Sequence, residues 1–190
     1  MGYDISLVDR KTRETLLLKN AFYKRGSNVR ANVDANGNLH QIPEQEAYLS
    51  ITYNYSGYYY EATDGDERFW DEDKENRGLN GLNGKTAAES IKMLTDMLER
   101  IRSKYLVDGE WTSGDRIKYK YFDEKGNEID PIYAITHHIP KTEVEEHYTV
   151  SEGDTSNYWE ETAANAMNSL QQLLYMAVEC STLDCVWEVC

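Results

Sequence analysis

The sequence predicts an α+β fold in which an antiparallel sheet packs against two long helices. The first supporting feature is the segment 47–60, which holds six of the fifteen tyrosines and alternates over its first nine residues. One face of this extended segment would carry Leu49, Ile51, Tyr53 and Tyr55. Because β-branched and aromatic side chains suit a half-buried pleated surface, the segment predicts the central strand of the sheet. The second feature is a pair of segments with apolar residues at helical spacing, 87–105 and 157–179.

The N-terminal residues are predicted to form a hairpin. Residues 3–8 alternate between apolar and polar side chains, and 15–18 would return as the second strand after a polar turn. The following segment, 20–43, is rich in Asn and Gly and predicts a loop with at most a short strand.

Both predicted helices have capping signals at their first residues. Thr86 precedes the first helix, and Glu89 three residues later completes a capping box. Ser156 is the expected cap of the second helix, 157–179, with Glu160 and Glu161 in its first turn. Small alanines on the second helix favour close packing against the first helix or across the sheet.

The segment between the helices is predicted to be a β-rich insertion, 108–150, within a single domain that spans 1–190. Residues 117–122 alternate, and 123–127 (DEKGN) predicts a hairpin turn. Residues 133–139 and 143–150 are expected to form a second hairpin around Pro140.

The charge is strongly and unevenly negative. The net charge is −14, of which residues 61–190 contribute −15 and residues 1–60 contribute +1. Because an acidic surface repels phosphate, direct DNA or RNA binding is not expected. The excess acid suits a partner with a basic surface, and it also keeps a protein soluble.

The sequence predicts a cytoplasmic protein with reduced cysteines and no membrane contact. No apolar run approaches the roughly 18 residues of a membrane span, and residues 1–10 lack a signal-peptide pattern. The three cysteines all lie in the last eleven residues, where an odd number does not form a disulfide framework. The same tail includes Val186, Trp187 and Val189, which predict a short closing strand.

Motifs for catalysis, cofactors and metals are incomplete. The segment 78–86 resembles a phosphate-binding loop, but Leu79 stands where the motif requires glycine. An EF-hand counted from Asp71 fails at its glycine and closing glutamate positions. Three histidines in the insertion, His137, His138 and His147, would need further ligands to hold a metal, as would the cysteines. We therefore predict no catalytic residue, no cofactor and no metal, while clustered carboxylates leave adventitious divalent-ion binding open.

Five blocks of sequence, taken together, resemble a family of small proteins from phages and mobile elements. They are YDISLVD at 3–9, TRETL at 12–16, SITYNYS at 50–56, GLNGKTAAESIKML at 81–94 and YWEETAANAMNSLQQLL at 158–174. At least one lineage resembling this family inhibits the effector nuclease of type II CRISPR systems. The blocks cover scaffold elements, whereas 61–75 and 108–150 exceed the short connections of that family.

The resemblance implies a type II-A anti-CRISPR protein that binds and inhibits an RNA-guided effector nuclease with its guide RNA. Such effectors hold nucleic acid in a positively charged channel, which dense carboxylates could occupy. The segment 61–75 carries a net −6 and is predicted to be an exposed loop. Aromatic neighbours would anchor the contact, because interface hot spots favour Trp and Tyr. The predicted partner-binding residues are Tyr58, Tyr59, Asp64, Asp66, Glu67, Phe69, Trp70, Asp71, Glu72, Asp73 and Glu75.

Two other functions stay open at this point. One is a phage accessory or scaffold protein that has no nuclease partner, and the sequence does not separate it from an inhibitor. The other is a small acid–base enzyme, although no pair of carboxylates or Cys/His pair has a recognisable spacing. An exposed aromatic strand edge would also allow a homodimer.

Overall fold

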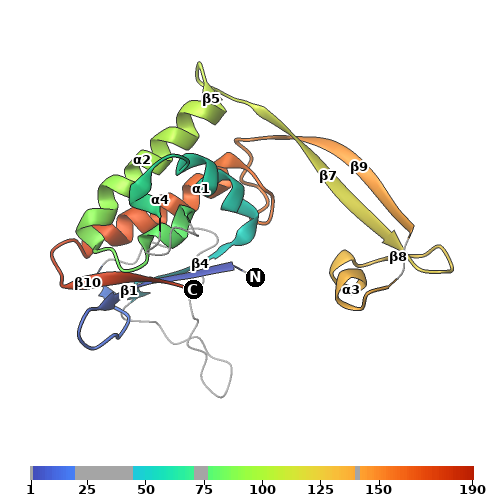
Figure 1. The fold of residues 1–190 in the computed structure, drawn as a ribbon. Helices are drawn as coiled ribbons and strands as arrows, with labels where there is room; N and C mark the ends of the chain where they lie inside the picture. The colour runs from blue at the N-terminus through green and yellow to red at the C-terminus, as the bar shows by residue number, and fades with distance from the viewer. Residues whose placement is uncertain (1, 20–44, 71–76, 140–141) are drawn as a thin grey trace.

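The α+β prediction is confirmed by the computed structural model, which describes residues 2–19, 45–70, 77–139 and 142–190. Figure 1 shows two parts, a compact body and a long arm that projects from it. We call residues 113–151 the arm and the remaining described residues the body. The predicted loop 20–43 lies outside the described residues.

The body contains a three-stranded antiparallel sheet whose central strand is the N-terminal one. β1 (Gly2–Asp9) pairs with β4 (Tyr48–Thr52) on one side and with β10 (Cys185–Val189) on the other. Two residues of β1 pair on both sides: Ile5 lies opposite Leu49 and Val189, and Ser6 lies opposite Tyr48 and Glu188. The closing strand predicted in the tail is thus present, but the segment 47–60 supplies an edge strand rather than the central one.

The tyrosine-rich segment becomes helical after Thr52, contrary to the prediction of a single strand. Thr52 accepts a hydrogen bond from the Asn54 amide at 3.3 Å and caps η1 (Tyr53–Tyr55), which continues into α1 (Ser56–Ala62). The buried side chains of this stretch are Tyr55, Tyr58, Tyr59 and Ala62. Their spacing of three, four and seven residues is that of a helix face, which alternation over the first nine residues concealed.

Two long helices lie over one face of the sheet (Figure 1). α2 (Ala87–Tyr105) begins at the predicted Thr86 and Glu89 capping box. α4 (Ala163–Glu179) packs against α2, and Thr162 caps it by accepting a hydrogen bond from the Asn165 amide. The prediction that the helix starts at residue 157 is therefore wrong. Residues 152–162 form an irregular connection, in which the Trp159 side chain is exposed.

Shorter elements complete the body. The predicted N-terminal hairpin forms in part, because Thr15 bridges to Val8 and the Leu16 amide donates to the Leu7 carbonyl at 2.9 Å. Beyond this point β2 (Leu17–Leu18) pairs with β3 (Gln45–Glu46) rather than with β1. The remaining elements are η2 (Glu67–Phe69), η3 (Gly78–Leu82), β5 (Leu106–Val107) and β6 (Glu110–Trp111).

The arm is a two-stranded ribbon with a short helix at its far end. β7 (Ser113–Phe122) pairs with β9 (Thr142–Ser151) along ten consecutive register positions, and β8 (Glu128–Ile129) adds a short third strand. α3 (Pro131–Thr136) follows β8. The DEKGN turn is where the sequence predicted it, but the predicted second hairpin is wrong, because residues 133–136 are helical and β9 pairs with β7.

No helix in the described part of the chain is long and apolar enough to cross a membrane. The three cysteines are free thiols; Cys180 and Cys185 are buried and Cys190 is exposed. Burial raises the pKa of the Cys180 thiol to about 11, so this group stays protonated at neutral pH.

Candidate interaction surface

The predicted acidic contact segment is divided between helix, turn and undescribed chain. Asp64, Asp66, Glu67 and Trp70 lie near the surface of the body, around η2. Four other predicted contact residues lie outside the described residues: Asp71, Glu72, Asp73 and Glu75.

Most described carboxylates of this segment are paired with bases. Asp66 contacts Arg68 at 2.6 Å and Arg100 of α2 at 2.8 Å. Glu61 pairs with Lys104, and Asp64 pairs with Arg77. A paired carboxylate presents a weaker field to a basic partner than the sequence count suggests. In the described part of the chain, neighbouring basic side chains therefore cancel most of the negative charge of this segment.

The hydrogen bonds from Arg68, followed by those from Arg100, hold the pKa of Asp66 well below its usual range. Because the folded-state pKa is lowered, Asp66 contributes stability above the pKa of an unfolded aspartate, and the contribution is lost as pH falls through the folded-state pKa. The loop carboxylate is thus also a structural residue, which ties η2 to α2.

We expect Asp66→Asn to destabilise the fold by about 1 kcal/mol at pH 7, a modest figure because water screens the exposed arginines. The difference from the wild-type protein should shrink as pH falls below about 4, because the aspartate of the unfolded chain then takes up a proton while the folded carboxylate is still charged. Urea unfolding at pH 7 and at low pH measures both quantities. Glu67→Gln is the matched control on the same turn, and an equal loss for the two variants at pH 7 would contradict this role.

The predicted aromatic anchors Tyr58, Tyr59 and Phe69 belong to the core and offer no surface to a partner. Tyr59 and Phe69 are fully buried, and Tyr58 is nearly so. The Tyr59 hydroxyl donates to the Ala166 carbonyl of α4 at 3.2 Å. The helical spacing of Tyr55, Tyr58 and Tyr59, rather than the acidic neighbourhood, was the sequence signal for the packing of these tyrosines. Phe69 is buried from a separate element, η2. Trp70 alone of the described aromatic anchors retains an exposed ring.

A buried ion pair, which sequence reasoning missed, fixes the base of the arm to the body. Arg116 of β7 contacts Glu152 at 2.9 Å, and their side chains are 17% and 4% exposed. Glu152 also accepts a hydrogen bond from the Ala163 amide at the start of α4, at 2.9 Å. The Arg116 guanidinium further donates to the Glu161 carbonyl. We call Arg116 and Glu152, with Tyr58, the clamp.

Tyr58 completes the clamp from the body side. Its hydroxyl donates to Glu152 at 2.6 Å and accepts from Arg116 at 2.7 Å. Burial, followed by the hydrogen bond to Glu152, raises the pKa of Tyr58 above its ordinary value, so the phenol keeps the proton that it donates. These three residues are widely separated in sequence, so no local sequence pattern predicts their contact.

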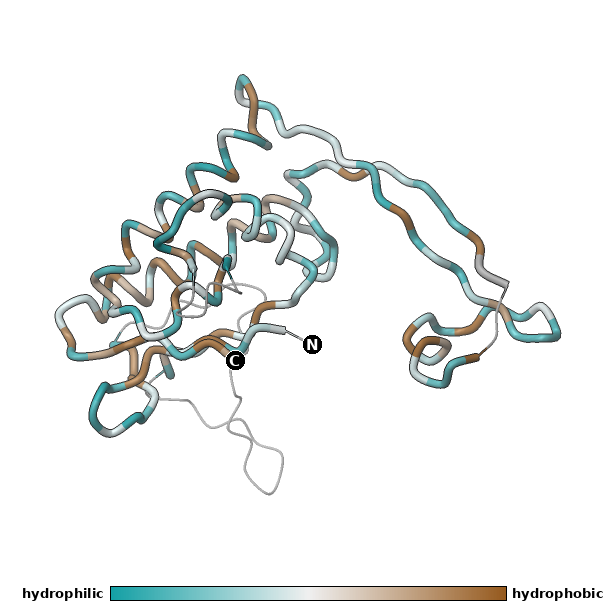
Figure 2. The backbone as a smooth tube through the Cα atoms, viewed as in Figure 1, coloured by the Kyte–Doolittle hydropathy of each residue, from teal (hydrophilic) through white to brown (hydrophobic). Residues whose placement is uncertain are grey.

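The far end of the arm carries the most exposed apolar group of the described chain. Ile132, Tyr133 and Ile135 of α3 are 75%, 52% and 56% exposed. Figure 2 shows brown, hydrophobic segments in the same helix, far from the body. The sequence did signal a helix here, because Asp130-Pro131 is an N-cap followed by proline at the first helical position.

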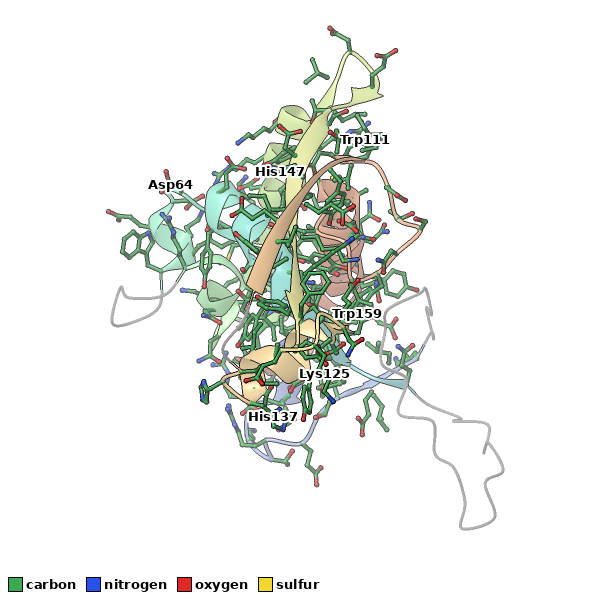
Figure 3. All side chains as sticks on the ribbon, turned by 90° about the vertical axis from the view of Figure 1, so that its right-hand side faces the viewer. Asp64, Trp111, Lys125, His137, His147 and Trp159 are labelled. Atoms are coloured by element: carbon green, nitrogen blue, oxygen red, sulfur yellow. The ribbon has the colours of Figure 1, made fainter. Side chains whose placement is uncertain are left out.

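No group of three or more His, Cys, Asp or Glu in the described ranges is arranged to hold a metal ion. Figure 3 places His137 near the tip of the arm, and His147 lies on β9 closer to the base of the arm. His137 stacks on Tyr133 with ring centroids 4.0 Å apart, and His147 lies 3.5 Å from Glu145.

A surface depression of about 490 Å³ on α2 is lined by Asp96, Glu99, Arg100 and Ser103. Two of these lining residues already belong to the ion-pair network around Asp66. The depression therefore shares Asp96 and Arg100 with the ion-pair network around Asp66.

Comparison of the whole chain with protein-family models, with curated proteins and with solved structures finds no match in any of the three.

Proposed function

We propose that this chain is a non-catalytic protein that binds and inhibits a type II RNA-guided effector nuclease, and that the arm makes the contact. The observation that carries a binding role is the arm itself, a ten-pair ribbon that projects from the body and exposes apolar side chains at its end. Exposed apolar side chains that are grouped together are typical of interaction sites.

The distribution of the resemblance supports the arm as the functional addition. The blocks that resemble the phage family fall on β1, β4, η3, α2 and α4 or their connections, all within the body. The arm lies between α2 and α4, where the family has a short connection. A scaffold with a rigidly attached insertion is the usual way in which a fold acquires a new contact surface.

The negative net charge of the chain supports a partner that has a basic surface. The chain has a net charge of −14, and an RNA-guided effector holds its heteroduplex in a positively charged channel. Complementary charge speeds encounter and makes binding weaken as salt rises. The acidic segment 61–75 is a less favourable contact than its composition indicates, because three of its described carboxylates are paired.

A short-arm variant tests this function. Lys118 and Glu146 lie directly opposite each other, so residues 119–145 can be replaced by Asn-Gly, which suits a two-residue hairpin turn. This change retains the clamp at the base of the arm. The intact chain should co-purify with a guide-loaded type II effector and suppress target cleavage, and the short-arm variant should do neither.

If the intact chain neither binds nor inhibits any guide-loaded type II effector, the proposed function is wrong and an accessory or scaffold role takes its place. If the short-arm variant inhibits as well as the intact chain, the contact lies on the body. Thermal melting of both proteins controls for folding.

A further inference from the structure

We propose that the tip of the arm enters an apolar pocket of the partner protein, and that arginine or lysine side chains border this pocket. The tip comprises the described residues 123–139. This inference rests on the proposed function, because it names how the same effector is recognised. It rests separately on the packing, rigidity and charge of the tip.

The packing of α3 is inverted relative to an ordinary surface helix. Ala134 is fully buried against the ribbon, whereas Ile132, Tyr133 and Ile135 are more than half exposed. At about 100° per residue these three side chains span roughly 160° of the helix, centred opposite Ala134. A helix that serves folding alone would bury its large apolar residues and expose the small one. The outer face of α3 is therefore suited to a surface that the described part of the chain does not supply.

The tip is already ordered for docking. Asp130 accepts a hydrogen bond from the Tyr133 amide at 3.0 Å and caps the helix. The His137 ring stacks on Tyr133 with an interplanar angle of 28°, and its Nδ1 lies 2.9 Å from the Tyr133 carbonyl. An aromatic side chain that is already held in place loses little conformational freedom on binding. Tyr133 is accordingly the expected anchor of the contact.

The charge of the tip that carries this apolar face predicts the charge of the partner's rim. The described tip carries four carboxylates and one lysine: Asp123, Glu124, Glu128, Asp130 and Lys125. Hydrogen bonds from Asn127 lower the pKa of Asp123, so this carboxylate is ionised at neutral pH. Charges bordering a contact favour a partner of opposite sign and disfavour one of like sign. Two tips of the same chain would repel each other, which argues against a second copy as the occupant.

The ribbon below the tip is a less suitable contact. Ile117 and Tyr119 are also exposed, but charged residues alternate with them along β7. Lys120 pairs with Glu146 at 2.7 Å across the two strands. The ribbon therefore positions the tip at a distance from the body, and the continuous apolar face begins at α3.

A pair of matched triple variants tests the tip. Ile132→Ser, Tyr133→Ser and Ile135→Ser together remove the outer face of α3. Trp159→Ser, Val178→Ser and Leu183→Ser together remove three comparably exposed apolar side chains from the body. We expect the tip variant to bind a guide-loaded effector at least about 100-fold more weakly, as loss of two hot-spot residues would. The body variant should stay within about threefold of the wild-type protein.

A charge variant provides a second measurement that does not depend on the apolar face. Glu124→Lys with Glu128→Lys, both on exposed residues, should weaken binding by about tenfold at low salt and by less at high salt. This variant also covers the case in which the triple tip variant fails to fold, which melting would reveal.

The outcomes separate the inference from the proposed function. Wild-type affinity in the tip variant, with inhibition intact, would overturn the tip as the contact and leave the inhibitor function standing. Tighter binding by the Glu124→Lys and Glu128→Lys variant would overturn the basic rim. Absence of binding by the wild-type chain would remove both, whereas tip-dependent self-association in sedimentation would point to a second copy instead.

Discussion

Leu170→Asp should abolish the cooperative folding of this protein. Leu170 lies on α4, is fully buried, and belongs to the core formed where α4 packs against α2 and the sheet. An unpaired carboxylate at that position costs several kcal/mol, and the lost leucine packing adds to this. The sum approaches the roughly 5–15 kcal/mol by which a domain is normally stable.

The adjacent residue supplies the control for that change. Gln171 is exposed on the same helix, so Gln171→Asp introduces the same charge into solvent and should cost no more than about 0.5 kcal/mol in helix propensity. Circular dichroism during heating distinguishes the two variants. A soluble Leu170→Asp protein that melts cooperatively near the wild-type temperature would show that this face of α4 is not buried.

Some elements could be predicted because their signals are local. The start of α2 is set by Thr86 and Glu89, which lie within three residues of each other and satisfy the first backbone amides. The apolar spacing of α2 and α4 likewise repeats within each helix. Such signals do not depend on what the rest of the chain does, so the sequence is sufficient to recognise them.

The tyrosine-rich segment could not be assigned by its alternation, because two periods fit it. Tyr53 and Tyr55 continue the alternation of β4, whereas Tyr55, Tyr58 and Tyr59 fit a helix face. Packing against distant residues decides between them: Tyr55 makes an edge-to-face contact with Tyr158, and Tyr59 bonds to the Ala166 carbonyl. Tertiary contacts of this kind override a local β-propensity.

The candidate contact surface was mislocated for the same reason. A count of acids along 61–75 does not include Arg100, which lies 34 residues beyond Asp66 in sequence yet contacts it at 2.8 Å. Phe122 pairs with Thr142, so the whole tip lies between the two paired strands in the sequence. The sequence pattern instead favoured pairing of 143–150 with the nearer segment 133–139. The helix α3 was the exception, since its Asp130-Pro131 signal was local and was overlooked.

Arg116→Met should cost about 3–5 kcal/mol and loosen the arm, because it leaves the Glu152 carboxylate buried without its positive partner. Gly114 shows how tightly this region is built, since a Cβ there would lie 2.3 Å from a Glu152 oxygen. Hydrogen exchange should then rise at the amides of the arm's base, while α2 keeps its protection.

Two further variants establish that the buried charge, and not the loss of a long side chain, is the cause. Arg116→Met combined with Glu152→Met removes both charges and should recover much of the lost stability. Lys120→Met removes the base from an exposed pair on the same strand and should cost less than about 1 kcal/mol. If urea unfolding gives Arg116→Met and Lys120→Met the same cost, the arm is not held by the clamp. If it gives the expected order, the clamp stabilises the attachment of the arm to the body, and with it the base from which the tip would make its contact.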